Sequence, residues 1–151
     1  MKLDGVYTFH APRQLVWETV LDPEALRRCI PGLETFEPAG QDEYAATMKI
    51  GVGSIKGSYS AKIRIFDLRE PEHYKLSVEA KGTPGFVRGE GSFNLRADDA
   101  ETTTLRWEAD AQIGGAVAAV GQRMLGGVAK MTIGQLWVAL DAQVKARQAG
   151  G

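Results

Sequence analysis

Short segments that alternate strictly between apolar and polar residues follow one another through most of this 151-residue sequence. The alternation covers residues 3–9, 43–50, 59–65, 73–81 and 105–113. A period of two residues is typical of β-strands with one covered and one solvated face. The turns between segments, such as residues 70–72 and 97–101, are too short to hold the helices that parallel strands require. The sequence therefore predicts an antiparallel sheet.

Two short helices are expected between the first strand and the rest of the sheet. Pro12 suits the first turn of a helix because its fixed φ angle is already helical. A second helix starts at Asp22, which caps the N-terminus, followed by Pro23 in the first turn and Glu24 near the positive helix end. This second helix must end before the Pro-Gly pair at residues 31–32.

The last third of the sequence changes to a helical period. Apolar residues spaced by three or four predict a long amphipathic helix over about residues 117–147. It is the only predicted element large enough to cover the apolar face of the sheet, so the sequence predicts an α+β helix-grip fold. In this fold a curved antiparallel sheet of about seven strands wraps around the long C-terminal helix. We expect one domain over residues 1–147 and a short flexible tail over residues 148–151.

Glycine is unusually frequent, with 18 glycines among 151 residues. Gly89 and Gly91 fall on the inward face of a predicted strand. Others lie inside the predicted long helix, where each costs about 1 kcal/mol relative to alanine; these are Gly121, Gly126, Gly127 and Gly134. Two interpretations stay open: the glycines allow close packing of the helix on the sheet, or they leave a cavity beneath a deformable helix.

Composition excludes several classes of function. The formal net charge of −1 gives no general attraction to nucleic acid. The single cysteine, Cys29, cannot form a disulfide within the chain, which indicates a reducing, cytoplasmic compartment. We expect Cys29 to be a buried, apolar core residue. His10 and His73 lie far apart in the sequence, so no metal site is expected. No uncharged apolar run reaches the roughly 18 residues of a membrane span.

Four segments of the sequence resemble one family. They are V-W-E-T-V-L-D-P-E-A-L-R-R-C-I-P-G-L-E at residues 16–34, V-G-S-I-K-G-S-Y-S-A-K-I at 52–63, G-T-P-G-F-V-R-G-E-G at 82–91 and I-G-G-A-V-A-A-V-G-Q-R-M-L-G-G-V-A-K at 113–130. Together they are similar to the CoxG family, the G subunits of carbon monoxide dehydrogenase, over nearly the whole chain. This family belongs to the START-like, or SRPBCC, superfamily, whose helix-grip fold agrees with the fold predicted from the two periods.

The resemblance implies a cavity between the sheet and the long helix that binds an apolar or amphipathic ligand, such as a lipid or a quinone. It also implies a non-catalytic accessory role, because CoxG proteins are typically associated with molybdenum-containing carbon monoxide dehydrogenase-type enzymes and recruit or couple them at the membrane. No other cofactor is required. We expect a cytoplasmic protein with peripheral contact at the inner face of the cell membrane. Some members carry a C-terminal extension that helps membrane attachment; this sequence stops just past its predicted last helix, which argues against direct anchoring.

The candidate ligand-binding residues are those expected to line the cavity: Trp17, Met48, Tyr59, Phe86, Gly89, Gly91, Trp107, Gly121, Met124, Val128 and Met131. Arg123 and Lys130 are expected at the pocket mouth, where they would hold a polar head group. Aromatic and methionine side chains on covered faces fill a core as readily as they contact a ligand, so both interpretations stay open. Phe86 either gates the pocket mouth or anchors a loop.

Two other functions stay open from the sequence. The first is an enzyme of the cyclase or aromatase type, which uses a few polar residues in the same cavity. The second is an interaction module in which only the surface matters. The G-x-S-x-G motif of a nucleophilic serine is absent, and Arg88 and Glu90 are expected to form a solvated cross-strand pair. We therefore expect no catalytic residue; titratable groups that converge inside the cavity would favour the enzyme.

Overall fold

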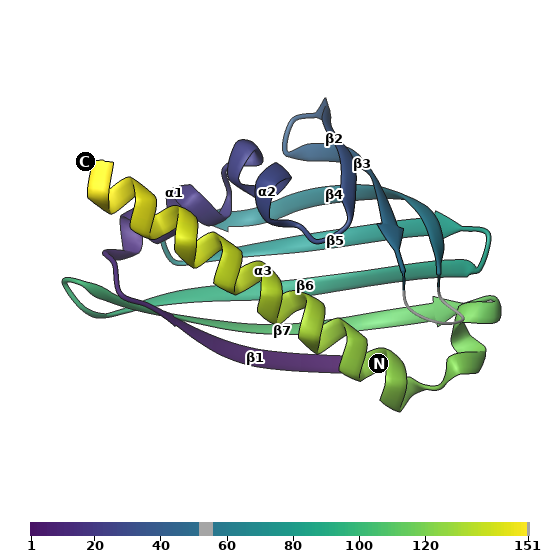
Figure 1. The fold of residues 1–151 in the computed structure, drawn as a ribbon. Coiled ribbons are helices and arrows are strands. Elements are labelled where there is room, and N and C mark those ends of the chain that lie inside the picture. Colours follow the sequence, from purple (N-terminus) through teal and green to yellow (C-terminus); the bar gives the residue numbers. More distant parts are fainter. Residues whose placement is uncertain (52–55, 151) are drawn as a thin grey trace.

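The computed structural model describes residues 1–51 and 56–150, which form a seven-stranded sheet and one long helix with shorter helices beside it (Figure 1). Residues 52–55, part of one of the four segments quoted above, lie outside the described residues. The strands are β1 (Lys2–Phe9), β2 (Leu33–Gly40), β3 (Glu43–Ile50), β4 (Gly57–Arg69), β5 (His73–Gly82), β6 (Gly85–Asp99) and β7 (Thr102–Gly114). The helices are α1 (Arg13–Val20), α2 (Pro23–Cys29), the 3₁₀ helix η2 (Ala116–Val120) and α3 (Gln122–Gly150).

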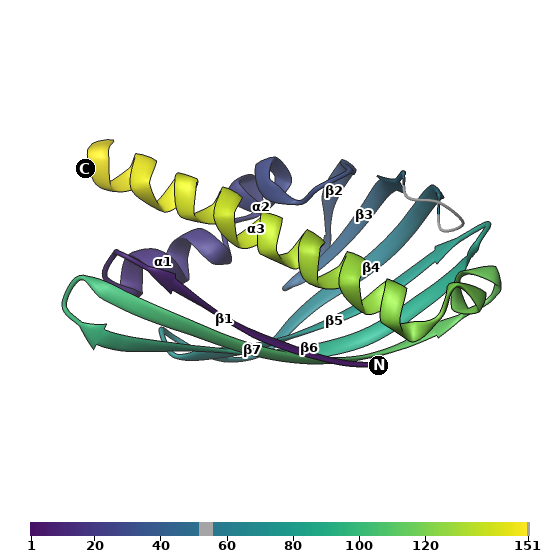
Figure 2. The same ribbon diagram turned by 60° about the horizontal axis from the view of Figure 1, so that its bottom comes forward.

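The sheet has the strand order β1-β7-β6-β5-β4-β3-β2, and every neighbouring pair is antiparallel. Each strand from β2 to β6 pairs with the next one along the chain, and β1 pairs with the last strand, β7. The sheet is strongly curved, and α3 crosses its concave side, with α1 and α2 beside the C-terminal part of α3 (Figure 2). The predicted α+β helix-grip fold is confirmed.

The long helix begins later than predicted. Residues 116–120 form the separate 3₁₀ helix η2, and α3 starts at Gln122 rather than near residue 117. Gly115 and Gly121 bracket η2 with φ angles of +80° and +97°, a left-handed region that favours glycine. Gly121 therefore breaks the helix instead of lying inside it, which leaves three glycines in the interior of α3. At its other end α3 continues to Gly150, so residues 148–150, predicted as a tail, are helical.

The start of α2 follows the capping prediction. The side chain of Asp22 accepts a hydrogen bond from the backbone N–H of Glu24 at 3.0 Å, and Pro23 occupies the first turn. Asp22 also forms an ion pair with Arg147 near the end of α3, which joins the two helices. Cys29, the last residue of α2, is buried as expected, and burial raises the pKa of its thiol.

The main hydrophobic core lies between α3, α1 and the inner face of the sheet. Its fully buried side chains include those of Phe9, Val16, Leu105, Leu140 and Val144. These residues lie toward the C-terminal half of α3, the part that α1 and α2 also contact. Among residues 1–51 and 56–150, no helix is both long enough and apolar enough to cross a bilayer.

A partly buried polar contact ties α3 to the edge strand β1. The hydroxyl of Tyr7 donates to Oδ2 of Asp141 at 2.8 Å, and Nζ of Lys145 lies 3.5 Å from the same oxygen. Burial of Tyr7, its hydrogen bond to Asp141 and the negative charge of Asp141 raise the pKa of Tyr7 to about 12. The neutral phenol is therefore the form that the folded protein stabilises.

We expect this contact to make stability depend on alkaline pH. An unfolded tyrosine has a pKa of about 10, so the contribution of neutral Tyr7 is complete below pH 10 and is lost as the pH rises through about 12. Tyr7→Phe should lower the free energy of unfolding at pH 7 by about 1 kcal/mol. Urea unfolding between pH 7 and 12 measures both effects. The variant should lose stability less steeply than the wild type; equal slopes would contradict this role of Tyr7.

Candidate ligand-binding cavity

Four small residues face the helix from the middle of β6 and β7. Gly89 lies opposite Ala111, and Gly91 lies opposite Ala109 on the neighbouring strand. We call these four residues the small-residue floor. Protein interiors are close-packed because larger side chains fill the space between a helix and a sheet. Where the sheet offers only hydrogen atoms and methyl groups, that space stays open.

The two glycines of the floor also pack tightly along the sheet. A Cβ atom on Gly91 would lie 3.0 Å from the ring of Phe93, and one on Gly89 would lie 3.2 Å from the carbonyl oxygen of Asp110. Even a methyl group there would require a neighbour to shift. These close contacts lie within the sheet and not with α3, so of the two interpretations the placement of Gly89 and Gly91 favours the cavity over close packing of the helix on the sheet.

A cavity of about 310 Å³ lies between the small-residue floor and α3. Small-molecule pockets in proteins are commonly about 300–1,000 Å³, so this cavity suits a small ligand. The roof comes from Ile133, Leu136, Trp137 and Leu140 of α3. Strands and short helices supply further aliphatic lining residues, namely Leu3, Val20, Leu21, Leu26, Ile65, Leu76, Val78 and Val87.

Aromatic side chains line one wall of the cavity. The rings of Tyr74 and Phe93 are stacked, with centroids 4.8 Å apart and an interplanar angle of 8°. Phe93 meets Trp137 of α3 nearly edge-on at 6.0 Å. Trp107 also lines the cavity, and its indole packs where β1 carries Gly5 instead of a larger residue. This wall connects the sheet to the helix.

The cavity is electrically neutral on its inner surface. Glu90 and Asp110 border it, but they alternate with the inward residues of β6 and β7, so their carboxylates belong to the outer face. Tyr74 is almost fully buried, and burial raises the pKa of its hydroxyl well above the usual value. No group of three or more potential metal ligands occurs among residues 1–51 and 56–150. The geometry suits binding of a neutral apolar ligand.

Three of the predicted ligand-binding residues, Gly89, Gly91 and Trp107, do line this cavity. Trp17 lies one layer behind it, where it is buried and meets the ring of Tyr74 edge-on at 5.7 Å. Contact of any of them with a ligand stays a prediction.

Three others belong to a separate apolar cluster near the N-terminal end of α3. Met48, Tyr59 and Val128 pack there with Val117 of η2 and Leu125 of α3. None of these residues lines the cavity of 310 Å³. Val128 lies two turns before Leu136, a roof residue, so the cluster continues the sheet–helix interface beyond the cavity.

The prediction that Met124 and Met131 lie on the covered face of the helix is wrong. Their side chains are 48% and 55% exposed, and Val138, seven residues further, is 61% exposed. Seven residues nearly complete two helical turns, so the three form one outer stripe of α3. The sequence of α3 thus carries two overlapping apolar stripes, and contacts with the sheet determine which one is buried. The buried stripe contains Leu125, Trp137, Leu140 and Val144.

The remaining predicted residues also lie away from the cavity. Arg123 and Lys130 are exposed and do not line it. Gly121 precedes α3 and has no other atom near the position of its absent Cβ. Phe86 is 40% exposed, and its ring covers Gly114 at the end of β7. This placement favours the loop-anchoring interpretation of Phe86 over the gating one.

Sequence reasoning missed much of the lining, above all Trp137, Leu136 and Ile133 of the roof. Tyr74, Leu76 and Val78 were recognisable as one face of a strand but not as cavity residues. One feature of the sequence could have indicated the cavity. Ala109 and Ala111 are small residues on the inward face of residues 105–113, the same face as Trp107.

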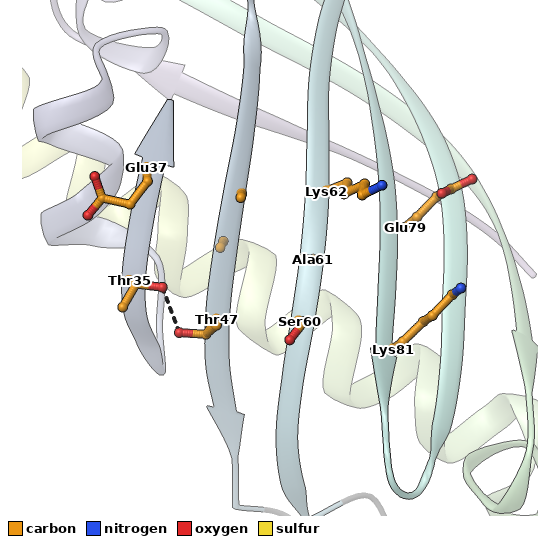
Figure 3. A pocket seen from close by; sticks show the side chains of 10 residues that line it. Thr35, Glu37, Thr47, Ser60, Ala61, Lys62, Glu79 and Lys81 are labelled. Atoms are coloured by element: carbon orange, nitrogen blue, oxygen red, sulfur yellow. Dashed lines mark hydrogen bonds between the residues drawn. The ribbon is translucent and has the colours of Figure 1, made fainter. Parts of the chain in front are cut away.

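A second hollow, of about 380 Å³, lies on the outer face of β2 to β5 (Figure 3). Its lining combines the alanines of β3 and β4 with hydroxyl-bearing and charged side chains at its border. The hydroxyls of Thr35 and Thr47 share a hydrogen bond of 2.7 Å, and Glu79 pairs with Arg88 on the next strand at 3.7 Å. These are solvated cross-strand contacts, so the cavity beneath α3 is the stronger candidate site.

Comparison with known proteins agrees with this geometry. The family model for the G subunit of carbon monoxide dehydrogenase (CoxG) matches residues 5–145. The chain belongs to the CoxG family. The resemblance seen in the four sequence segments is thereby confirmed. No curated protein matches this CoxG-family chain.

Solved structures similar to this CoxG-family chain include a conserved protein from Geobacillus kaustophilus. It is 38% identical, with a TM-score of 0.94 over 97% of this chain and 96% of that one. The Zhui aromatase/cyclase from Streptomyces sp. R1128 is 19% identical, with a TM-score of 0.72 over 100% and 98% of the two chains. A START superfamily protein from Mycobacterium smegmatis is 15% identical, with a TM-score of 0.73 over 96% and 97%. The last two show the fold alone.

We expect Ala109→Leu to fill part of the cavity without loss of stability. The three added carbons enter existing space, and each contributes up to about 0.8 kcal/mol when buried. The free energy of unfolding, measured in urea, should stay unchanged or rise by up to about 2 kcal/mol. Ala45→Leu makes the same change on the exposed outer face of β3 and should not raise it. A loss above about 1 kcal/mol, typical of overpacking, would show that no space exists above Ala109.

Proposed function

We propose that this CoxG-family chain is a non-catalytic accessory protein that binds an apolar or amphipathic ligand, a lipid or a quinone-like molecule, in the cavity beneath α3. The observation that carries the proposal is the lining of that cavity, which is aliphatic and aromatic on the floor, wall and roof. Apolar surface removed from water contributes about 25 cal/mol per Å² to binding. A ligand that fills this cavity would bury apolar surface on every side.

The partner that we propose is a molybdenum-containing carbon monoxide dehydrogenase-type enzyme, which the chain recruits or couples at the membrane. Membership of the CoxG family, named for carbon monoxide dehydrogenase, supports this partner. A protein that holds a lipidic molecule suits this task, because such a ligand is soluble in the bilayer and not in water. We propose that the chain acts in the cytoplasm, at the inner face of the cell membrane.

The outer stripe of α3 supports peripheral membrane contact. Met124, Met131 and Val138 present apolar side chains to solvent. Arg123 and Lys130, each next to one of the methionines in sequence, are exposed as well. Exposed apolar side chains flanked by basic ones are typical of helices that lie on an anionic bilayer surface.

An enzyme of the cyclase or aromatase type has no comparable support. Such an enzyme would need titratable groups that converge inside the cavity. Among the described lining residues, the carboxylates of Glu90 and Asp110 belong to the outer face of the sheet, and burial keeps the Tyr74 hydroxyl neutral. The similarity to the Zhui aromatase/cyclase concerns the fold.

One pull-down experiment tests both parts of the proposal. The tagged chain is isolated from its own cells in mild detergent, and mass spectrometry identifies bound small molecules and accompanying proteins. The wild type and the control Ala45→Leu should retain a lipid or quinone-like molecule and recover carbon monoxide dehydrogenase-type subunits. Ala109→Leu, with part of its cavity filled, should lose the ligand. A wild type without any ligand would contradict the cavity function, and the absence of a molybdenum enzyme would contradict the partner.

A further inference from the structure

The indole N–H of Trp137 is a buried donor without an acceptor. The Trp137 side chain is 4% exposed, and its Nε1 atom has no hydrogen-bond partner among the described residues. Native proteins nearly always pair such groups, because an unpaired polar group in an apolar interior loses its bonds to water without replacement. Trp137 lies in the roof of the cavity. The unpaired donor therefore lies on a lining residue of the candidate site.

The hydroxyl of Tyr74 is a second polar group on the same lining. Tyr74 is 3% exposed, and its hydroxyl takes part in none of the side-chain hydrogen bonds formed among the described residues. Its ring stacks on Phe93, and Phe93 in turn contacts the ring of Trp137. One aromatic wall thus carries the buried, unpaired Trp137 N–H and, on the other side of the Phe93 ring, the Tyr74 hydroxyl.

The hydroxyl of Thr132 and one carboxylate oxygen of Asp141, also on α3, do have partners. The hydroxyl of Thr132 donates to the backbone oxygen of Val128 at 2.9 Å, and Asp141 accepts from Tyr7. The second oxygen of Asp141, Oδ1, is buried and unpaired, one helical turn from Trp137. Asp141 does not line the cavity. A small shift that pairs the Trp137 N–H with Oδ1 of Asp141 is therefore the alternative to a hydrogen bond with a ligand.

We infer that the ligand of this cavity is neutral and largely apolar, and carries a carbonyl-type oxygen that accepts the Trp137 N–H, with the Tyr74 hydroxyl as a second contact. The inference rests on the proposed function, because it specifies the chemistry of the ligand bound there. A pure hydrocarbon would leave the buried Trp137 N–H unpaired. An ionised carboxylate would enter an apolar site in which no lysine, arginine or histidine lines the described cavity, at a large desolvation cost.

Two nearly isosteric probes separate the hydrogen bond from apolar contact. 2-Acetylnaphthalene carries a carbonyl oxygen at the position where 2-isopropylnaphthalene carries a methyl group. Both probes are neutral and unreactive toward Cys29. Isothermal titration calorimetry measures the binding of each probe to the wild type and to Trp137→Phe. The substitution should weaken ketone binding about tenfold, the scale of one lost hydrogen bond, beyond any change in hydrocarbon binding. Trp17→Phe, a buried tryptophan outside the lining, is the matched control and should affect both probes equally.

If Trp137→Phe folds poorly, a second variant and an NMR signal of the wild type still test the inference. Tyr74→Phe removes only the hydroxyl and should also weaken ketone binding more than hydrocarbon binding. In nitrogen-15 NMR spectra the three tryptophans each give one indole signal. The Trp137 signal should move downfield with the ketone and much less with the hydrocarbon.

The outcomes distinguish the inference from the proposed function. If Trp137→Phe and Tyr74→Phe weaken the binding of both probes equally, or if the Trp137 signal shows no selective shift with the ketone, the inference is overturned. The apolar cavity itself would remain. Failure of both probes, and of longer lipids and quinones, to bind the wild type would instead contradict the proposed function.

Discussion

The packing of α3 against the concave face of the sheet is the interaction on which the rest of the structure depends. A helix covers a curved sheet most closely when large side chains from both sides interlock. At the C-terminal half of α3 this happens, and Leu140 and Val144 are fully buried. Toward the N-terminus of the helix from Leu140, the roof residues Ile133, Leu136 and Trp137 lie opposite the glycines and alanines of the small-residue floor. The cavity is the consequence of this mismatch in size.

The same mismatch explains the chemistry of the site. Only inward positions of the strands and the covered face of α3 reach the cavity, and alternation sends the charged residues of β6 and β7 to the outer face. What remains inside is neutral, with the Trp137 N–H as a buried unpaired donor among the described residues and the Tyr74 hydroxyl on the same wall. Affinity would come mainly from apolar area, and selectivity from these few polar groups.

Much of the fold was predictable from the sequence, because periods of two and of three to four residues are local signals. The antiparallel sheet, the covering helix and every strand except β2 followed directly from them, and the Asp22 cap followed from its residue type. The start of α3 did not, because Gly121 in a left-handed conformation looks like any other helix glycine in the sequence. The outward position of Met124 and Met131 was missed for a different reason: the rotation of a helix about its axis is set by tertiary contacts.

The candidate site was predictable in part. Gly89 and Gly91 were recognisable as inward residues without side chains, and they belong to the floor of the cavity. Trp137 was not recognisable, because nothing in its sequence surroundings marks an indole N–H that lacks a partner. Met48, Tyr59 and Val128 were expected beside these residues, yet they form a cluster of their own, since the interface beneath α3 is longer than one pocket.

The central claim is that the small-residue floor leaves open space beneath α3. A crystal structure determined under xenon pressure tests it most directly, because xenon occupies dry apolar cavities and needs no knowledge of the natural ligand. We predict xenon between Gly91 and Ala109 on the floor and Leu136 in the roof. A crystal in which α3 rests directly on the floor, with no xenon beneath it, would contradict the account.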